Sequence, residues 1–172
     1  MSDVEFVEVR DEPFHRHSFE NRYARMYDVL IPTGEASLFH RHTEDTFYAI
    51  VHDVRLREQV FGEEPGPDGT IPGGLAICRP HRAEPLIHRV TNVGTESARM
   101  IGAEVKESPR VVAQDPLDAP AHELRFEVER LRAYDLVIDA DADTVKADYG
   151  FASLTVALCR ASLLVRDGDG PE

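Results

Sequence analysis

The hydrophobic stretches of this sequence are short. Although 42% of its 172 residues are hydrophobic, no run approaches the roughly 18 apolar residues that a membrane-spanning helix needs. Residues 1–8 are acidic and only mildly apolar, so they also lack the basic and apolar regions of a secretory signal. We therefore expect a cytoplasmic protein without a membrane partner.

Cysteine is scarce, and basic residues are outnumbered by acidic ones. Cys78 and Cys159, the only two cysteines, each lie in an apolar run typical of a strand, where a reduced thiol packs as a small hydrophobe. The 32 acidic residues exceed the 19 Lys and Arg residues, for a formal net charge of −13 at pH 7, and no basic cluster alternates with aromatic residues. Because such a chain repels phosphate backbones, no nucleic-acid partner is expected.

What the sequence does contain is a series of short strand-like runs. They are rich in β-branched and aromatic residues, they are separated by turn signals, and they cover residues 4–9, 23–32, 36–42, 46–61, 75–79, 86–93 and 98–105. This spacing is typical of an all-β sandwich or barrel. The longest break, residues 63–74, is rich in Gly and Pro and is expected to form a loop over an opening.

The second part of the chain repeats the first. Proline and polar residues at 107–120 indicate a linker, and the pattern of residues 19–31 then recurs after a constant offset of 107 residues, without a gap, in residues 126–138. The same offset places Ala147 opposite His40 and Tyr149 opposite His42. The sequence thus predicts a barrel over residues 1–106, the linker, and a degenerate partial repeat over 121–172 that packs on the barrel or on a partner subunit. Chance similarity between two edge strands is the alternative. The unpaired strand edges of a partial repeat favour a homodimer.

Three histidines are candidate metal ligands. His40 and His42 are two residues apart on a predicted strand, so both imidazoles point to the same face, and a barrel could bring His88 across from a later strand. Three neutral imidazoles on one side of an ion leave positions open for substrate, and imidazole suits iron, zinc, copper and nickel alike. The alternative is a set of solvent-exposed histidines. The triplet His15-Arg16-His17 has the same spacing, but no third ligand is evident beside it, so we expect a solvated N-terminal strand there.

These residues resemble the two short motifs of the cupin superfamily. Gly34, five residues and then His40-Arg41-His42 are similar to the first motif, and Gly74, five residues, Pro80 and later His88 and Asn92 are similar to the second. The resemblance covers roughly residues 19–106. It implies an all-β fold, the double-stranded β-helix or jelly-roll barrel, with His40, His42 and His88 as metal ligands and frequent dimerisation.

Two departures from the motifs bear on the site. The glutamate that the first motif places four or five residues after its second histidine is missing. The aromatic pair Phe47-Tyr48 resembles the one that follows the family's glutamate and puts Asp45 in its place, so Asp45 is the candidate fourth ligand; Glu44 is the second choice, and three histidines completed by water are the remaining option. The segment from Pro80 to His88 is three residues longer than the second motif and lacks its glycine, which adds polar residues near the site.

Other polar side chains have both a functional and a structural interpretation. Tyr48 is a candidate catalytic residue that could donate a proton or hydrogen bond near the metal, or it packs in the core. Arg79 and Arg82, with His81, could bind a substrate carboxylate at the barrel mouth, since a guanidinium matches a carboxylate in bidentate fashion. Salt bridges with the acidic surface are the alternative for these arginines.

The expected function is that of a metal-dependent protein acting on a small organic molecule. Fe2+ is the expected metal and a dioxygenase-type oxidation the expected reaction, because cupins without the glutamate resemble the thiol and diketone dioxygenases. Zn2+, Ni2+ or Mn2+ on the same ligands would support isomerase or lyase chemistry instead. The sequence is also compatible with a barrel that binds a metabolite and a metal without turnover, and with a purely structural subunit.

Overall fold

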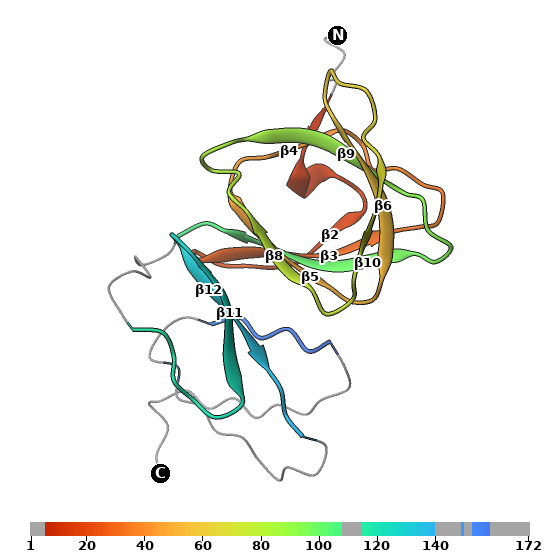
Figure 1. The fold of residues 1–172 in the computed structure, drawn as a ribbon. Helices are drawn as coiled ribbons and strands as arrows, with labels where there is room; N and C mark the ends of the chain where they lie inside the picture. Colours follow the sequence, from red (N-terminus) through yellow and green to blue (C-terminus); the bar gives the residue numbers. More distant parts are fainter. Residues whose placement is uncertain (1–5, 108–114, 140–148, 150–152, 159–172) are drawn as a thin grey trace.

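The computed structural model of the protein describes residues 6–107, 115–139, 149 and 153–158. These residues are almost all β, with a short 3-10 helix near the N-terminus (Figure 1). Cys159, Ala147 and parts of the expected linker and repeat lie outside the described residues. No helix in the described residues is long and apolar enough to cross a membrane. The elements are β1 (Val7–Glu8), η1 (Val9–Asp11), β2 (His15–Glu20), β3 (Ala24–Ile31), β4 (His40–His42), β5 (Asp45–Ile50), β6 (Val54–Val60), β7 (Asp68–Ile71), β8 (Ala76–Arg79), β9 (Leu86–Asn92), β10 (Ala98–Val105), β11 (His122–Val128) and β12 (Leu131–Leu136).

Strands β1 to β10 form two five-stranded sheets that close into a barrel (Figure 1). One sheet has the order β1-β4-β9-β6-β7 and the other the order β2-β3-β10-β5-β8. The strand pairs are antiparallel except for β1 and β4, which run parallel. The chain passes repeatedly from one sheet to the other, which is the arrangement of a jelly-roll barrel. The expected all-β fold, a double-stranded β-helix or jelly-roll barrel, is confirmed.

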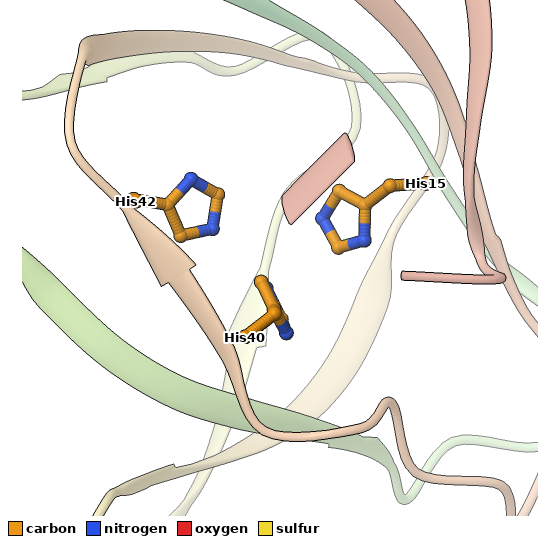
Figure 2. Close-up of side chains that lie close together, drawn as sticks. All are labelled: His15, His40 and His42. Carbon is orange, nitrogen blue, oxygen red and sulfur yellow. The ribbon is translucent and has the colours of Figure 1, made fainter. Parts of the chain in front are cut away.

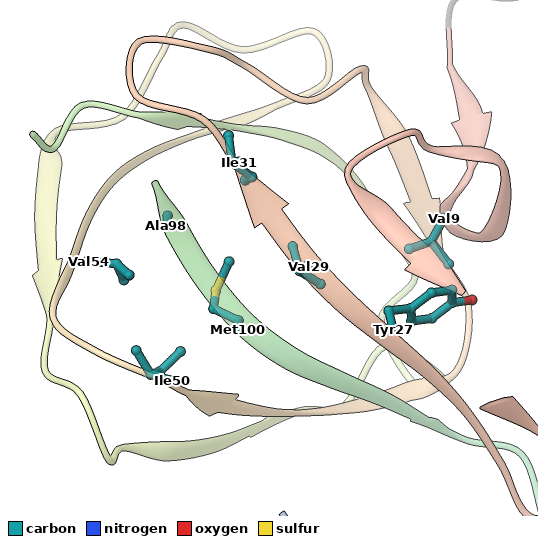
Figure 3. Packing of buried hydrophobic residues seen from close by; sticks show 8 residues of the cluster. All are labelled: Val9, Tyr27, Val29, Ile31, Ile50, Val54, Ala98 and Met100. Carbon is teal, nitrogen blue, oxygen red and sulfur yellow. The ribbon is translucent and has the colours of Figure 1, made fainter. Parts of the chain in front are cut away.

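Alternation along β3 builds the apolar core. Tyr27, Val29 and Ile31 point into the barrel, and each is 1% exposed. The apolar side chains that pack with them come from η1 and from the strands around the barrel (Figure 3): Val9, Ile50, Val54, Ala98 and Met100. Burial of each large apolar side chain stabilises the fold by about 1.5–3 kcal/mol, so β3 and its neighbours form a firm scaffold beside the histidines.

The segment 63–74 is only partly the loop that its composition predicts. Asp68–Ile71 form β7, which pairs antiparallel with β6 and becomes an edge strand of the first sheet. The Asp68 carboxylate accepts hydrogen bonds from Arg55 and Arg57 of β6. The expectation of a loop was therefore wrong for these residues. Their Gly and Pro content indicated a loop, but pairing with β6 satisfies their backbone hydrogen bonds and makes them a strand.

The hairpin of β11 and β12 resembles the hairpin of β2 and β3. The register shifts at equivalent positions, between His17 and Phe19 and between Leu124 and Phe126. The two hairpins also share an ion pair at the offset of 107 residues: Arg25–Glu20 and Arg132–Glu127. The two hairpins thus share a bulge and an ion pair at matching positions, as two copies of one unit would.

The C-terminal hairpin contacts the barrel through Arg130. Arg130 lies in the turn between β11 and β12, and its Nη2 donates to the carbonyl oxygen of Lys106 at 2.6 Å. Its Nη1 is 3.6 Å from both the Glu44 Oε2 and the Asp45 Oδ2 atoms. Ion pairs of Arg130 with Glu44 and Asp45 therefore join the turn between β4 and β5 to the C-terminal hairpin.

Candidate metal centre

Strand pairing brings the three predicted ligands together. On β4, His40 and His42 point inward and are 0% and 1% exposed, whereas Arg41 between them points outward and binds Glu8. β4 pairs with β9 so that His40 stands directly opposite His88. The His88 ring centroid is 4.7 Å from that of His40 and 5.1 Å from that of His42. The alternation expected from the sequence thus places all three imidazoles on the inner face.

A fourth histidine, His15, joins this group. His15 begins β2 and is 6% exposed, and its ring centroid is 4.6 Å from that of His40. Nitrogen atoms of His15, His40 and His42 all lie within 4.8 Å of one another, and Figure 2 shows the three rings gathered around a common space. The expectation of a solvated strand was wrong for His15, although His17 is exposed as predicted.

Each of three imidazoles is fixed at its Nδ1 atom. The His15 Nδ1 donates to Glu12 Oε2 at 2.7 Å, and the His88 Nδ1 donates to Glu58 Oε1 at 2.5 Å. The His40 Nδ1 is 2.8 Å from the carbonyl oxygen of Leu38, which can only accept. A proton on Nδ1 leaves the lone pair on Nε2, so these contacts orient the Nε2 atoms as ligands, as the outer partners of metal-bound histidines do.

The remaining ring nitrogens are what a metal ion would bind. The Nε2 atoms of His40 and His88 and both ring nitrogens of His42 are buried without a hydrogen-bond partner. Buried polar atoms almost always have a hydrogen-bond partner or a metal ion, so this group of unpaired ring nitrogens indicates a site for a bound ion. The set offers only imidazole nitrogens, which suits divalent iron, zinc, copper or nickel. A divalent transition metal therefore fits these residues.

The protonation states agree with this interpretation. Burial, together with the neighbouring His15 and His88, lowers the pKa of His40 to about 2. Burial and the adjacent His40 hold the pKa of His42 well below its ordinary value. Both rings are neutral at pH 7 and can donate a lone pair. The hydrogen bond from His88 lowers the pKa of Glu58 to about 2, so this outer carboxylate is ionised.

The structure does not bring Asp45 or Glu44 to the imidazoles. Asp45 Oδ1 accepts the backbone N–H of Arg82 at 3.0 Å, and Glu44 Oε2 is 3.4 Å from the Arg82 Nε atom. Both carboxylates also face Arg130 of the C-terminal hairpin. In this structure the side chain that joins His40 and His42 is His15, in place of the carboxylate that the motif predicts.

The other predicted residues lie around the cluster. The Tyr48 ring is 6.4 Å from the His42 ring and packs against the core, and burial raises the pKa of Tyr48, which keeps its hydroxyl protonated. Arg79 makes two hydrogen bonds to Glu58, at 2.6 and 3.1 Å. Arg82 is largely exposed beside Glu44. Both arginines are thus engaged in ion pairs, the alternative that the sequence left open.

His81 lies against the centre from outside the strands. It follows β8 in the turn that leads to β9 and is 4% exposed. Its ring stacks on His42 at 4.9 Å between centroids and 26° between planes, and its Nε2 has no hydrogen-bond partner. Burial lowers the pKa of His81 to about 4. His81 comes from the segment that is longer than the second motif.

Comparisons with known proteins find similar solved structures. No family model matches the chain, and no curated protein matches its sequence. A cupin domain from Bordetella pertussis Tohama I is 20% identical, with a TM-score of 0.47, over 53% of this chain and 90% of that one. An RmlC-like cupin family protein with a double-stranded β-helix fold from Methanocaldococcus jannaschii is 10% identical, with a TM-score of 0.43, over 62% and 85%. A cupin superfamily protein from Desulfitobacterium hafniense DCB-2 is 11% identical, with a TM-score of 0.40, over 53% and 74%.

Proposed function

Because this chain folds as a cupin, and its barrel encloses a cluster of imidazoles, we propose that it is a metal-dependent cupin acting on a small organic molecule, with an iron-dependent dioxygenase-type oxidation as its reaction. One observation carries the proposal: the ring nitrogens of His40, His42 and His88 that face one another are buried and unpaired. Each unpaired buried polar atom costs about 1–3 kcal/mol, and a bound divalent ion would offset that cost.

The chain's residues would share the work around the ion. His40, His42 and His88 would hold it, with His15 as the fourth imidazole, while Glu12 and Glu58 fix ring orientation from behind. Ferrous iron at this place would supply coordination positions for an organic substrate and dioxygen and would mediate the transfer of electrons from the substrate to dioxygen. Tyr48, kept protonated by burial, would offer a hydrogen bond near His42.

The charges nearby favour a substrate without a strong negative charge. Arg79 remains the candidate substrate contact because it lies beside the histidines, but Glu58 already neutralises it. Arg82 faces Glu44 and Asp45. We therefore propose a small, largely uncharged substrate in place of the carboxylate that the two arginines suggested. Redox-silent isomerase or lyase chemistry with Zn2+, Ni2+ or Mn2+, and metabolite binding without turnover, are compatible with the same ligands.

The test is the metal content of the protein purified without added metal or chelator. The double variant His40→Ala/His42→Ala is compared with His17→Ala, which removes an exposed histidine outside the cluster. Near-stoichiometric iron that is lost only in the double variant, followed by oxygen consumption with small thiols or diketones, would support the proposal. Zinc, nickel or manganese in the same pattern would favour redox-silent chemistry. Equal metal in all three proteins, or none, would refute the metal site.

We also propose that the chain forms a homodimer. Several apolar side chains of the C-terminal hairpin and the residues after it are exposed, among them Leu124, Val128, Val137 and Ile138. Apolar patches of this kind often mark protein interfaces. Sedimentation equilibrium of the full chain tests this proposal, and a monomer at micromolar concentration would refute it.

A further inference from the structure

A pocket of about 340 Å³ opens beside the metal centre. It is lined by residues at the end of β8, in the following turn and at the start of β9: Arg79, Pro80, His81, Glu84, Pro85 and Leu86. Pockets of this size accommodate small organic molecules. The lining carries no unpaired positive charge, since Arg79 is bound by Glu58. The other charged side chain of the lining is the Glu84 carboxylate, so the pocket disfavours anions and suits a small molecule without negative charge.

Two lining residues lead from this pocket to the imidazoles. Leu86 stands opposite His42 in the pairing of β4 with β9. It is also two residues before His88, so its side chain points to the same inner face. The His81 ring touches both places, because it lines the pocket and stacks on His42. A molecule that moves from the pocket toward His42 meets the ring of His81 first.

The position of His81 fits a movable barrier better than a fixed ligand. The residue lies in a turn held by hydrogen bonds from Ala83 N and Glu84 N to the Pro80 carbonyl oxygen, not in the ladder of a strand. Its ring lies face to face with His42. Its Nε2 is buried without a hydrogen-bond partner, which costs free energy in the position seen here. Rotation of the ring toward solvent, or toward a ligand, would give this nitrogen a partner.

We propose that the pocket is the route by which a small uncharged substrate reaches the metal, and that the His81 side chain is the gate between the two. In the closed position seen here the ring covers His42, and the substrate gains access when the ring turns away. This inference rests on the metal site of the proposed function. It makes His81 a residue that controls access, outside the set that holds the ion.

The experiment loads the full chain with Co2+ and follows the binding of pyridine, a small ligand that is uncharged at neutral pH, by the visible absorption of the cobalt ion. Three proteins are compared: the unchanged chain, His81→Ala, which removes the barrier, and His81→Phe, which keeps an aromatic ring but no ring nitrogen. His17→Ala serves as the control for loss of an exposed histidine. Cobalt content and thermal unfolding are measured first, so that each protein is known to be folded and loaded.

A gate predicts faster entry only when the ring is removed. If the closed ring is displaced about a tenth of the time, pyridine should associate about tenfold faster with His81→Ala, while His81→Phe and the control resemble the unchanged chain. Equal rates in all four loaded proteins would overturn the gate and leave the metal site standing. Loss of cobalt in His81→Ala alone would make His81 a ligand and also overturn the gate. Failure of the unchanged chain to bind cobalt would overturn the proposed metal site and the gate with it.

Discussion

Glu58 is the outer carboxylate whose removal tests the metal site most directly. Its Oε1 atom accepts hydrogen bonds from both the His88 Nδ1, at 2.5 Å, and Arg79, at 2.6 Å. The substitution Glu58→Gln keeps the size of the side chain and one carbonyl oxygen but removes the charge. His88 then loses a charge-assisted hydrogen bond, and Arg79 loses its ion pair.

The loss should appear as weaker metal binding. Mutation of outer partners of metal-bound histidines costs about 10- to 100-fold in affinity, which corresponds to about 1.4–2.8 kcal/mol. The pKa of Glu58 is lowered to about 2, so the carboxylate is fully ionised at pH 7, and an effect toward the upper part of this range is expected. A competition titration of Zn2+ or Co2+ against a coloured chelator at pH 7 measures the change.

The chain offers a matched control on the other side of β4. Glu8 binds Arg41, which lies between His40 and His42 but points out of the barrel. Glu8→Gln removes an ion pair next to the same strand without touching an imidazole, so metal affinity should stay within about twofold. If Glu58→Gln binds metal as tightly as the unchanged chain, or if both variants lose affinity equally, the reasoning from His88 to the metal fails.

Three further predictions rest on the same geometry. His15→Ala should lower metal affinity in the competition titration by at least about tenfold while His17→Ala leaves it unchanged, and equal affinities would remove His15 from the site. The metal-free protein should lose stability as the pH falls from 6.5 toward 2, by about 1.4 kcal/mol per unit for His40, because the unfolded chain binds a proton that the buried ring does not. Urea unfolding at several pH values measures this, and a flat profile would contradict it. Tyr27→Phe should cost about 1–3 kcal/mol in urea unfolding, since it leaves the buried Glu104 without the hydroxyl at 2.7 Å, and an unchanged midpoint would refute that account.

The predictable part of the site depends on local alternation. His40 and His42 share a face because successive side chains of a strand point to opposite sides, and this follows from the sequence alone. The position of His88 opposite His40 depends on the register of β4 and β9, which the sequence suggested only through the resemblance of both segments to family motifs. The jelly-roll barrel was likewise predictable only through that resemblance, because the spacing of strands along the sequence fits sandwiches and barrels equally well.

The histidine that was missed depends on contacts between distant segments. His15 is buried because β2 pairs with β3, which places His15 beside Val29, and because Glu12 after η1 accepts its Nδ1 proton. Neither contact is visible in local composition. One signal was present: at the offset of 107 residues the repeat also has a histidine, His122, and its ring contacts Tyr134 as the ring of His15 contacts Tyr27.

Strand alternation also explains the placement of Asp45. Thr46 is buried on β5 at 1% exposed, and Tyr48 packs against the core, so these two side chains point into the barrel. Asp45 is three residues from Tyr48, and an odd separation on a strand points to the opposite face. An inward Tyr48 and an inward Asp45 are therefore incompatible on a regular strand. The alignment of Phe47-Tyr48 with the family's aromatic pair, which put Asp45 in the place of the glutamate, did not take this alternation into account.

In the part of the chain that the structure describes, no carboxylate joins the cluster of imidazole nitrogens, which bears on the charge around a bound ion. The His15 ring is hydrogen-bonded to the Glu12 carboxylate, and the His88 ring is hydrogen-bonded to the Glu58 carboxylate. The second oxygen of Glu12 accepts the backbone N–H of Leu38, and the carbonyl oxygen of Leu38 accepts from His40 Nδ1. For an ion bound by these imidazoles, the negative charge of Glu12 and Glu58 would therefore act across the rings. A carboxylate in direct contact would stabilise a trivalent ion more than a divalent one, because the Coulomb energy grows with the product of the charges and falls with distance. Moving that charge outward would favour the divalent state, which the iron-dependent oxidation that we propose requires before dioxygen binds.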